Sequence, residues 1–208
     1  MGRYVGPSCR LCRREGMKLM LKGERCFSSK CAIMKKKLPP GSMPKRRTKT
    51  SEFGIQLREK QKVKRYYGLA ERQFKRYFEL AARKKGVTGE ILLILLEQRL
   101  DNVVYRMHFA SSRKMARQLI THGHITVNGK KVDVPSYLVR EGDEIEVKES
   151  SRKLIPILES MKDISRIGTV PWIEVDPDNL KGNFVYIPKR EEIDLPVNEQ
   201  LIVEYYSK

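Results

Sequence analysis

Apolar residues recur along this chain with two different periods. Between about residues 51 and 120 they return every three or four positions, which is the spacing of an amphipathic α-helix. After Gly123 apolar and polar residues alternate with a period of two, as they do along a half-buried β-strand. The pattern therefore predicts an α+β fold, in which helices come first and a small antiparallel sheet follows.

Four helices are expected before Gly123. The helical pattern that starts at Ser51, caps at Thr88 and at Ser111 or Ser112, and glycine stops place them at about residues 51–68, 71–85, 88–107 and 111–123. The second helix carries its aromatic and small apolar residues on one face, namely Phe74, Tyr77, Phe78 and Ala81. That regular spacing favours core packing over stacking on bases, and it leaves the charged face for a partner.

Short strands and turns are expected in the C-terminal part. A hairpin is predicted around the turn Asn128-Gly129, with a strand on each side at 125–127 and 131–134 and a third strand at 144–147. A short helix is predicted at 155–161. Strands or buried extended segments are predicted at 172–175, 184–187 and 201–205.

The charge of the chain indicates a polyanionic partner. Lys and Arg number 43 against 25 acidic residues, which gives a formal net charge of +18 over 208 residues. Residues 1–50 alone carry 15 basic and 2 acidic side chains. Because such an excess repels itself unless an anion neutralises it, nucleic acid is the expected partner, chiefly of the N-terminal half. No apolar run is long enough for a membrane span, so we expect a cytoplasmic protein with no membrane partner.

Four cysteines lie within the first 31 residues, in the spacing Cys9-x2-Cys12 and Cys26-x4-Cys31. In a reducing compartment two close pairs joined by a loop are typical of a tetrahedral four-thiolate zinc site. An iron–sulfur cluster and a metal-free loop remain open, because the second pair is wider than a usual zinc knuckle. A redox-active pair is disfavoured, since no βαβ pattern surrounds Cys9 and Cys12.

Catalytic machinery is not indicated by the sequence. The histidines His108, His122 and His124 have no spacing that suggests a nucleophile partner or a metal site with Glu. No phosphate-cradling glycine loop is found, and Asp101-Asn102 falls inside a predicted helix, where a surface or interhelical role is expected. We therefore expect a binding protein, not an enzyme.

The cations expected to contact RNA fall into two groups, one in the N-terminal half and one further along the chain. In the second group Arg113 and Arg117 lie four residues apart on the fourth helix, and together with side chains of the following turns they could form one RNA-binding patch. A solvated charged face without a binding role is an equally supported interpretation there. The full set is Arg3, Arg10, Arg13, Arg14, Lys22, Arg25, Lys35, Lys36, Lys37, Lys45, Arg46, Arg47, Arg58, Lys62, Arg65, Arg72, Arg106, Arg113, Lys114, Arg117, Gln118, His122, His124, Lys130 and Lys131.

Several segments, in this order and spacing, closely resemble the bacterial small ribosomal subunit protein four family. They are residues 2–7 (GRYVGP) with the four cysteines, 57–62 (LREKQK), 73–74 (QF), 99–106 (RLDNVVYR), 116–129 (ARQLITHGHITVNG) and 195–206 (LPVNEQLIVEYY). The resemblance runs nearly from end to end. It implies an N-terminal four-cysteine module at 1–45, a helical domain at 46–95 completed by the tail 178–208, and a small inserted α+β RNA-binding domain at 96–177.

The resemblance also implies a function. Such a protein is a primary binder of 16S rRNA in the small (30S) subunit, recognises a multi-helix junction of the 5′ domain by shape and backbone, and nucleates assembly of the subunit body. It lies beside small-subunit protein five, where decoding accuracy is affected, and near protein three, where basic side chains meet the incoming mRNA. In some bacteria the family represses its own operon. Many members lack some or all of the cysteines.

Two other interpretations stay open from the sequence. The segment from about Arg99 to Val147 resembles a small RNA-binding fold that is appended to pseudouridine synthases and some aminoacyl-tRNA synthetases, so an RNA-modifying or RNA-charging enzyme is the alternative. The rest of the chain is accounted for without a catalytic domain. A zinc-dependent regulator that binds DNA is the third interpretation, and it predicts comparable affinity for duplex DNA.

Overall fold

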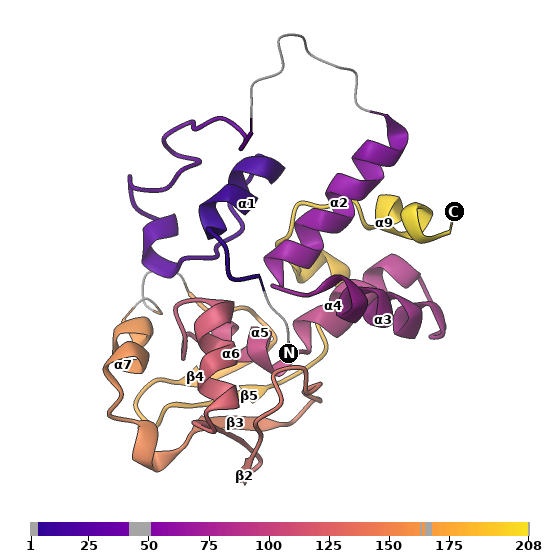
Figure 1. Cartoon of the computed structure of the whole chain (residues 1–208). Helices are drawn as coiled ribbons and strands as arrows, with labels where there is room; N and C mark the ends of the chain where they lie inside the picture. The colour runs from indigo at the N-terminus through magenta and orange to yellow at the C-terminus, as the bar shows by residue number, and fades with distance from the viewer. Residues whose placement is uncertain (1–3, 42–50, 163, 165–167, 208) are drawn as a thin grey trace. The chain divides into compact units, whose positions relative to one another are not determined.

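A computed structural model describes residues 4–41, 51–162, 164 and 168–207. The chain forms two compact units, of which the first comprises Met1–Leu92 and Leu195–Lys208 and the second comprises Leu93–Asp194 (Figure 1). The second unit is thus inserted into the first. The domain limits expected from the sequence, 1–45, 46–95 with 178–208, and 96–177, stay predictions at the level of single residues.

The N-terminal part of the first unit has little regular structure. It contains helix α1 (Ser8–Glu15), the short 3-10 helix η1 (Gly23–Cys26) and irregular chain as far as residue 41. Helix α1 ends at Gly16, whose left-handed φ of 69° is a conformation that glycine adopts without strain. The buried apolar residues of this part are few, namely Cys12, Leu19, Leu21, Cys26 and Cys31. A core this small stabilises little by itself.

Four helices complete the first unit. They are α2 (Glu52–Tyr66), α3 (Glu71–Ala82), the beginning of α4 (Thr88–Glu97) and α9 (Glu199–Tyr206). The Ser51 side chain caps α2 by accepting a hydrogen bond from the Gly54 amide, at the point where the sequence predicted that the helix begins. Phe74 and Tyr77 are buried, as expected of core residues, and Phe78 stacks on Tyr206 at 4.5 Å between ring centroids.

The C-terminal tail is a helix, and the expectation of a strand or extended segment at 201–205 is wrong. The Asn198 side chain caps α9 by accepting a hydrogen bond from the Gln200 amide. Ile202 is buried, and the aromatic rings of Tyr205 and Tyr206 pack on residues of α2 and α3. A short apolar run fits a helix as well as a strand, and here the packing surface on α2 and α3 decides for the helix.

The second unit packs two helices on an antiparallel sheet. The helices are α5 (Leu100–Arg106) and α6 (Arg113–Thr121), and the unit also contains α7 (Ile155–Met161) and the 3-10 helices η2 (Glu149–Ser151) and η3 (Arg190–Glu192). The sheet order is β2-β1-β3-β5-β4, from strands β1 (Ile125–Val127), β2 (Lys130–Lys131), β3 (Glu144–Val147), β4 (Ile173–Asp176) and β5 (Lys181–Phe184). Its core includes Leu100, Phe109, Ile120, Ile145 and Trp172.

The sheet corrects the expected strands in detail. Asn128 and Gly129 both have positive φ, 50° and 72°, which confirms the predicted hairpin turn. Strand β2 is only two residues long, and β5 ends at Phe184, where the sequence had suggested that a strand begins. Strands β4 and β5 join the same sheet through β3, which periodicity alone does not show because pairing partners are distant in sequence.

The expected continuous helix from Thr88 to Met107 is broken. Arg99 has an extended backbone, with φ −66° and ψ 136°, and bridges Leu138 of the neighbouring chain segment. The Val139 amide donates to the Gln98 carbonyl, so the break is held by backbone hydrogen bonds. It turns the start of α5 and its side chains Asp101 and Asn102 into the interior. No helix in the described residues is long and apolar enough to cross a membrane.

Candidate RNA interface

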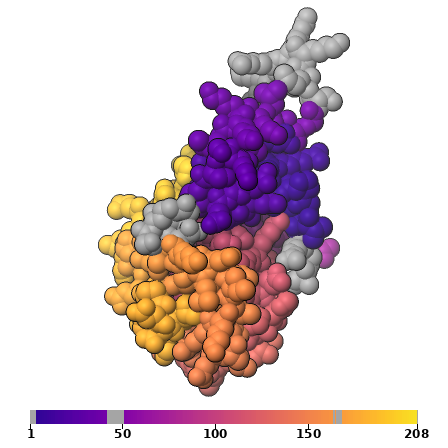
Figure 2. Space-filling model, turned by 90° about the vertical axis from the view of Figure 1, so that its left-hand side faces the viewer, coloured from indigo at the N-terminus to yellow at the C-terminus, as the bar shows by residue number. Residues whose placement is uncertain are grey.

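A basic pocket lies in the N-terminal part of the first unit. It is a cavity of about 580 Å³ whose lining includes six cationic side chains, and within the described residues no acidic side chain lines it. The six are Arg10, Arg13, Arg25, Lys30, Lys35 and Lys37. Five of these were expected to contact RNA from the sequence, and Lys30 was missed. The indigo-to-purple side chains of this part form one continuous face in Figure 2.

The four cysteines are brought together beside this pocket. All four line one small cavity of about 10 Å³, the room that a single water-sized sphere takes. They form no disulfide, and the Lys22 amide donates to the sulfur of Cys26 at 3.4 Å. Burial raises the pKa of the Cys12 and Cys26 thiols, and the charges of neighbouring cysteines raise it further.

The arrangement of these side chains does not by itself support the predicted metal module. Within the described residues, no group of three or more His, Cys, Asp or Glu side chains is placed to hold a metal ion. The physical reason lies in the thiols themselves, because nothing draws a neutral buried thiol close to three others, whereas a cation draws thiolates together. The structure does bring all four cysteines to one cavity, as their spacing in the sequence suggested.

The cations of α2 are held by carboxylates. The Glu15 side chain is fully buried and pairs with Arg58, at 3.1 Å between Nη1 and Oε1, and with Arg65. Lys62 pairs with Glu59 on its own helix. Burial raises the pKa of Glu15, while Arg58 and Arg65 act in the opposite direction. These side chains were expected to contact RNA, and their exposed fractions are 34% for Arg58, 22% for Arg65 and 22% for Lys62. Only part of each is therefore accessible to a partner.

Helix α3 carries an exposed basic face, of which the sequence analysis had named only Arg72 as an RNA contact. Its outward side and the following turn expose further cations, namely Lys75, Arg76, Arg83, Lys84 and Lys85. The signal was present in the helical period, because the cations of the helix lie opposite the buried Phe74, Tyr77 and Ala81.

Two expected RNA contacts of the second unit bond to partners inside it, and of these Arg113 is buried and Arg106 is half-buried. Arg113 is only 6% exposed; its Nε donates to Asn102 Oδ1 at 2.8 Å, and its guanidinium lies over the Tyr105 ring. Arg106 pairs with the fully buried Glu97 at 2.9 Å between Nη2 and Oε1. The expectation that Arg113 shares an exposed face with Arg117 is therefore wrong, because Arg113 opens α6 where it packs against α5.

The same network explains the polar pair at the start of α5. Asn102 donates to the Glu97 carboxylate at 2.6 Å and accepts from Arg113, so it links α4 to α6. Asp101 pairs with the buried Arg99 at 2.6 Å. Of the surface or interhelical role expected for this pair, Asn102 has the interhelical one, whereas Asp101 bonds to Arg99 at the start of its own helix. The sequence did not reveal that both side chains are buried.

The remaining predicted RNA contacts of the second unit lie at or near its surface. Lys114 and Arg117 are half-buried on α6, while Gln118, His122, Lys130 and Lys131 are exposed. His124 is half-buried and its Nδ1 lies 2.8 Å from the Ser151 hydroxyl. Burial lowers the pKa of His124, and the charges of His122 and Lys148 lower it further, which favours the neutral ring.

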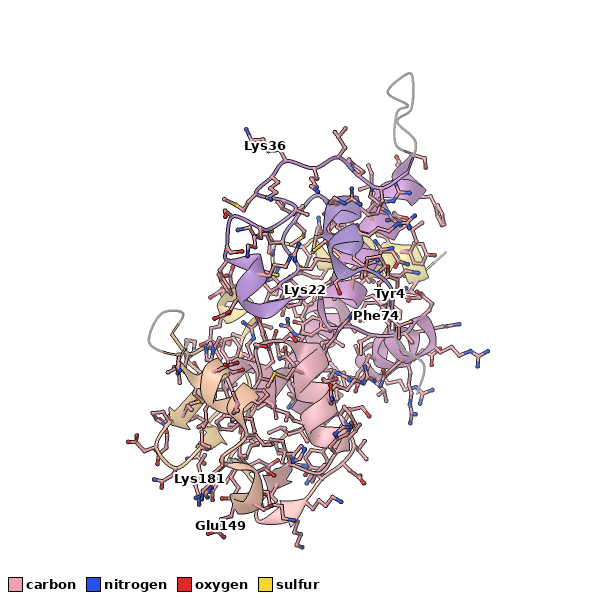
Figure 3. The ribbon with its side chains drawn as sticks, turned by 60° about the vertical axis from the view of Figure 1, so that its left-hand side comes forward. Tyr4, Lys22, Lys36, Phe74, Glu149 and Lys181 are labelled. Atoms are coloured by element: carbon pink, nitrogen blue, oxygen red, sulfur yellow. The ribbon has the colours of Figure 1, made fainter. Side chains whose placement is uncertain are left out.

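Other predicted contacts are exposed or lie outside the described residues. Arg14, Lys22 and Lys36 are exposed in the N-terminal part, and Figure 3 shows Lys36 at its outer edge. Four further cations expected to contact RNA fall outside the described ranges, namely Arg3, Lys45, Arg46 and Arg47.

These features define a class, a basic polyanion-binding protein with an inserted α+β domain. The family models described as the ribosomal protein S4/S9 N-terminal domain and the S4 domain match residues 3–97 and 98–145. Small ribosomal subunit protein uS4A of Symbiobacterium thermophilum is 62% identical, and the uS4 proteins of Thermodesulfovibrio yellowstonii and Thermus thermophilus are 60% and 56% identical, each over 100% of both chains. The chain therefore belongs to the uS4 family of small ribosomal subunit proteins, which confirms the family expected from the sequence.

Proposed function

We propose that this protein is a structural constituent of the small ribosomal subunit that binds rRNA and is not an enzyme. One observation carries the proposal: the chain is 56–62% identical, along its whole length, to curated small ribosomal subunit proteins. The cationic surfaces of both units agree with it, because a chain of net charge +18 needs a polyanion such as folded RNA to neutralise it. Its place of action is the cytoplasm, where small subunits work.

The recognition mechanism follows from where the cations lie. Exposed Lys and Arg side chains reach phosphate oxygens and the sugar edge, which gives shape-dependent binding with little reading of sequence. Arg58 and Arg65 are steadied by Glu15, so less side-chain freedom is lost when RNA binds. The second unit contributes a smaller surface on α6 and β2, built on a rigid core.

We also propose specific partners, which membership of the family does not establish by itself. We expect 16S rRNA of the 5′ domain to be the primary ligand, with small-subunit protein five and protein three as neighbours and mRNA close by where it enters the subunit. Assembly of the subunit body, decoding accuracy and repression of the protein's own operon are the roles that such a position implies. Support for each rests on the family resemblance of the whole chain.

Crosslinking of the protein within intact small subunits tests this placement directly. We expect crosslinks from the N-terminal part and from α3 to 5′-domain rRNA, and crosslinks to two neighbouring proteins. In parallel, a labelled 5′-domain transcript should be competed poorly by duplex DNA or by an unrelated RNA of equal length at the same salt concentration. Equal competition by all three, with no protein in purified subunits, would overturn the proposed function.

A metal ion in the N-terminal part is a second proposal, and Zn²⁺ is the ion favoured. Cys9, Cys12, Cys26 and Cys31 supply a four-sulfur donor set, and they face one cavity. The room of one water-sized sphere suits a single ion better than the alternative, an iron–sulfur cluster. When bound, the ion would cross-link α1 to the segment after η1 and so replace part of the missing hydrophobic core. The thiols must ionise and draw together to bind it.

Metal analysis and hydrogen exchange test this proposal. We expect about one zinc per chain, and we expect Cys9→Ser or Cys31→Ser, or chelation, to speed exchange mainly within residues 1–45. Exchange within α3 is the internal control and should not change. Iron in place of zinc would favour the iron–sulfur cluster. Unchanged hydrogen exchange within residues 1–45 would show that no metal ion stabilises this part.

A further inference from the structure

The basic pocket gathers cations from three separate segments of the N-terminal part. Arg10 and Arg13 come from α1, Arg25 from η1, and the lysines from the chain that follows. Like charges this close repel one another, so the folded pocket is less stable without an anion inside it. Within its described lining no carboxylate supplies that charge. The ligand must therefore bring several negative charges into a small volume.

We propose that this pocket binds successive phosphates of a sharply turned, protruding RNA backbone. The inference rests on the proposed function and deepens it by naming the shape of RNA that this part of the protein selects. Every nucleotide of RNA carries a charge, so a single turn of backbone presents several phosphates together. An acidic peptide presents fewer charges in the same space, and its carboxylates would also have to be folded together.

The shape of the site favours a turn over a regular duplex. A double helix is convex and is contacted by surfaces that follow its grooves, whereas an open recess of about 580 Å³ is better filled by a segment that projects from the RNA. Two prolines, Pro39 and Pro40, are part of the lining and stiffen it, because their φ angles are fixed. The Arg13 Nη1 donates to the Leu38 carbonyl at 3.1 Å and ties α1 to this wall.

The backbone of the lysine run 35–37 determines which of its side chains line the pocket. Lys35 and Lys37 line the cavity, but Lys36 between them does not. The Lys37 amide donates to the Ala32 carbonyl and the Lys36 amide to the Ile33 carbonyl, which is the hydrogen-bond pair of a Schellman turn. Lys36 takes the left-handed position of that turn, with φ 48°, and its side chain points outward in Figure 3.

Three single substitutions, Lys35→Ala, Lys36→Ala and Lys37→Ala, test the proposal with a matched control. Each removes one charge from the same run, and all three side chains are exposed, so folding should be retained. We expect Lys35→Ala and Lys37→Ala each to weaken binding of the 5′-domain transcript about 10-fold and to lower the salt slope by about one. Lys36 was also expected to contact RNA from the sequence, but because it lies outside the pocket lining, Lys36→Ala should change affinity less than about 2-fold. Equal effects of all three would show an unstructured basic run and overturn the pocket.

Phosphate-ethylation interference on the same transcript identifies the occupant. With the full-length protein we expect a cluster of two or three successive phosphates in a non-duplex segment, lost with Lys35→Ala and Lys37→Ala but kept with Lys36→Ala. Interference spread along a duplex would refute the proposal. Wild-type preference for the transcript with no effect of any pocket variant would refute the pocket but keep the proposed function. Crosslinks from the pocket to an acidic protein segment in intact subunits would assign it to protein instead.

Discussion

Arginines and lysines serve different purposes in the N-terminal part of the first unit and in the inserted unit. In the N-terminal part they surround an open pocket that no described acidic residue lines. In the inserted unit the buried Arg99 and Arg113 and the half-buried Arg106 bond to Asp101, Asn102 and Glu97. The same residue types thus provide a binding surface in one region and internal connections in the other, and only burial tells the two uses apart.

The difference follows from the size of the hydrophobic core. The inserted unit has a core of some 20 buried apolar residues, which can hold ion pairs away from water if every partner is supplied. The N-terminal part has too few apolar residues to bury charge, so its cations stay at the surface. Charge removal should therefore cost stability in the inserted unit and RNA affinity in the N-terminal part.

Removing the carboxylate at the centre of the internal network should have the largest effect on stability. Glu97→Ala leaves Arg106 and Asn102 buried without the carboxylate that both contact, and we expect a loss of about 3–5 kcal/mol in the free energy of unfolding of the inserted unit. Urea unfolding followed by the fluorescence of Trp172, the only tryptophan, measures it. Glu159→Ala on the exposed side of α7 is the control and should change stability by less than about 0.5 kcal/mol. Equal losses would mean that burial does not separate the two uses.

Arg113 and Arg117, one helical turn apart on α6, give the sharpest test within one element. Arg113→Ala should lower stability by about 2–3 kcal/mol, because it removes a buried charge-assisted hydrogen bond to Asn102, and should leave the salt slope of RNA binding unchanged. Arg117→Ala should lower the salt slope by about one and cost less stability than Arg113→Ala. Urea titration and RNA binding at several salt concentrations measure both variants. A lowered salt slope for folded Arg113→Ala would restore the exposed face expected from the sequence.

Local patterns in the sequence were sufficient for most of the fold. The apolar spacing located α2, α3, α4 and α6, the Asn128-Gly129 pair located the hairpin, and Ser112 is one of the two serines predicted to cap α6. The concentration of cations in the N-terminal half was anticipated from charge density, and the gathering of the cysteines from their spacing, but the pocket itself was not predicted. These features depend on neighbours in sequence, which is why periodicity reveals them.

The errors share one cause, which is that long-range partners decide them. The break at Arg99 is fixed by Leu138 and Val139, and the helical tail is fixed by its contacts with α2 and α3. Arg113 looks like a surface cation in the sequence because its partner Asn102 lies on another helix. A single sequence shows neither which segments meet nor which charges become buried.

The carboxylate that joins α3 to the tail predicts a smaller, pH-dependent effect. Burial acts to raise the pKa of Glu71, but hydrogen bonds from Lys60 and Lys64 outweigh it and lower the pKa from 4.5 to about 2. Because the folded pKa lies below the unfolded value, the contribution is fully present above about pH 4.5 and is lost as the pH falls toward 2. The Glu71 side chain is 47% exposed, so solvent screening limits the effect to about 1 kcal/mol.

Thermal unfolding between pH 7 and pH 3 measures this contribution. Glu71→Gln should be less stable than wild type at pH 7, and the difference should shrink as the pH falls below 4.5. Glu79→Gln, on the exposed side of the same helix, should keep the wild-type profile. A Glu71→Gln difference that stays constant down to pH 3 would assign the loss to packing of Tyr206, whose hydroxyl donates to Glu71, and not to charge.

The smallest expected effect concerns Lys36, where the N-terminal part holds a non-glycine residue in a left-handed conformation. Lys36→Gly removes the Cβ that makes this φ unfavourable and should slow hydrogen exchange of the turn amides by an amount equal to about 0.5–1 kcal/mol. Lys36→Ala removes the same charge but keeps the Cβ, so it should not slow exchange. Both variants should bind RNA almost as wild type does, because Lys36 lies outside the pocket lining. Slower exchange in both variants would show that charge repulsion, and not backbone strain, limits the stability of this turn. Loss of a cation would then stabilise the N-terminal part, whereas in the inserted unit it destabilises the fold.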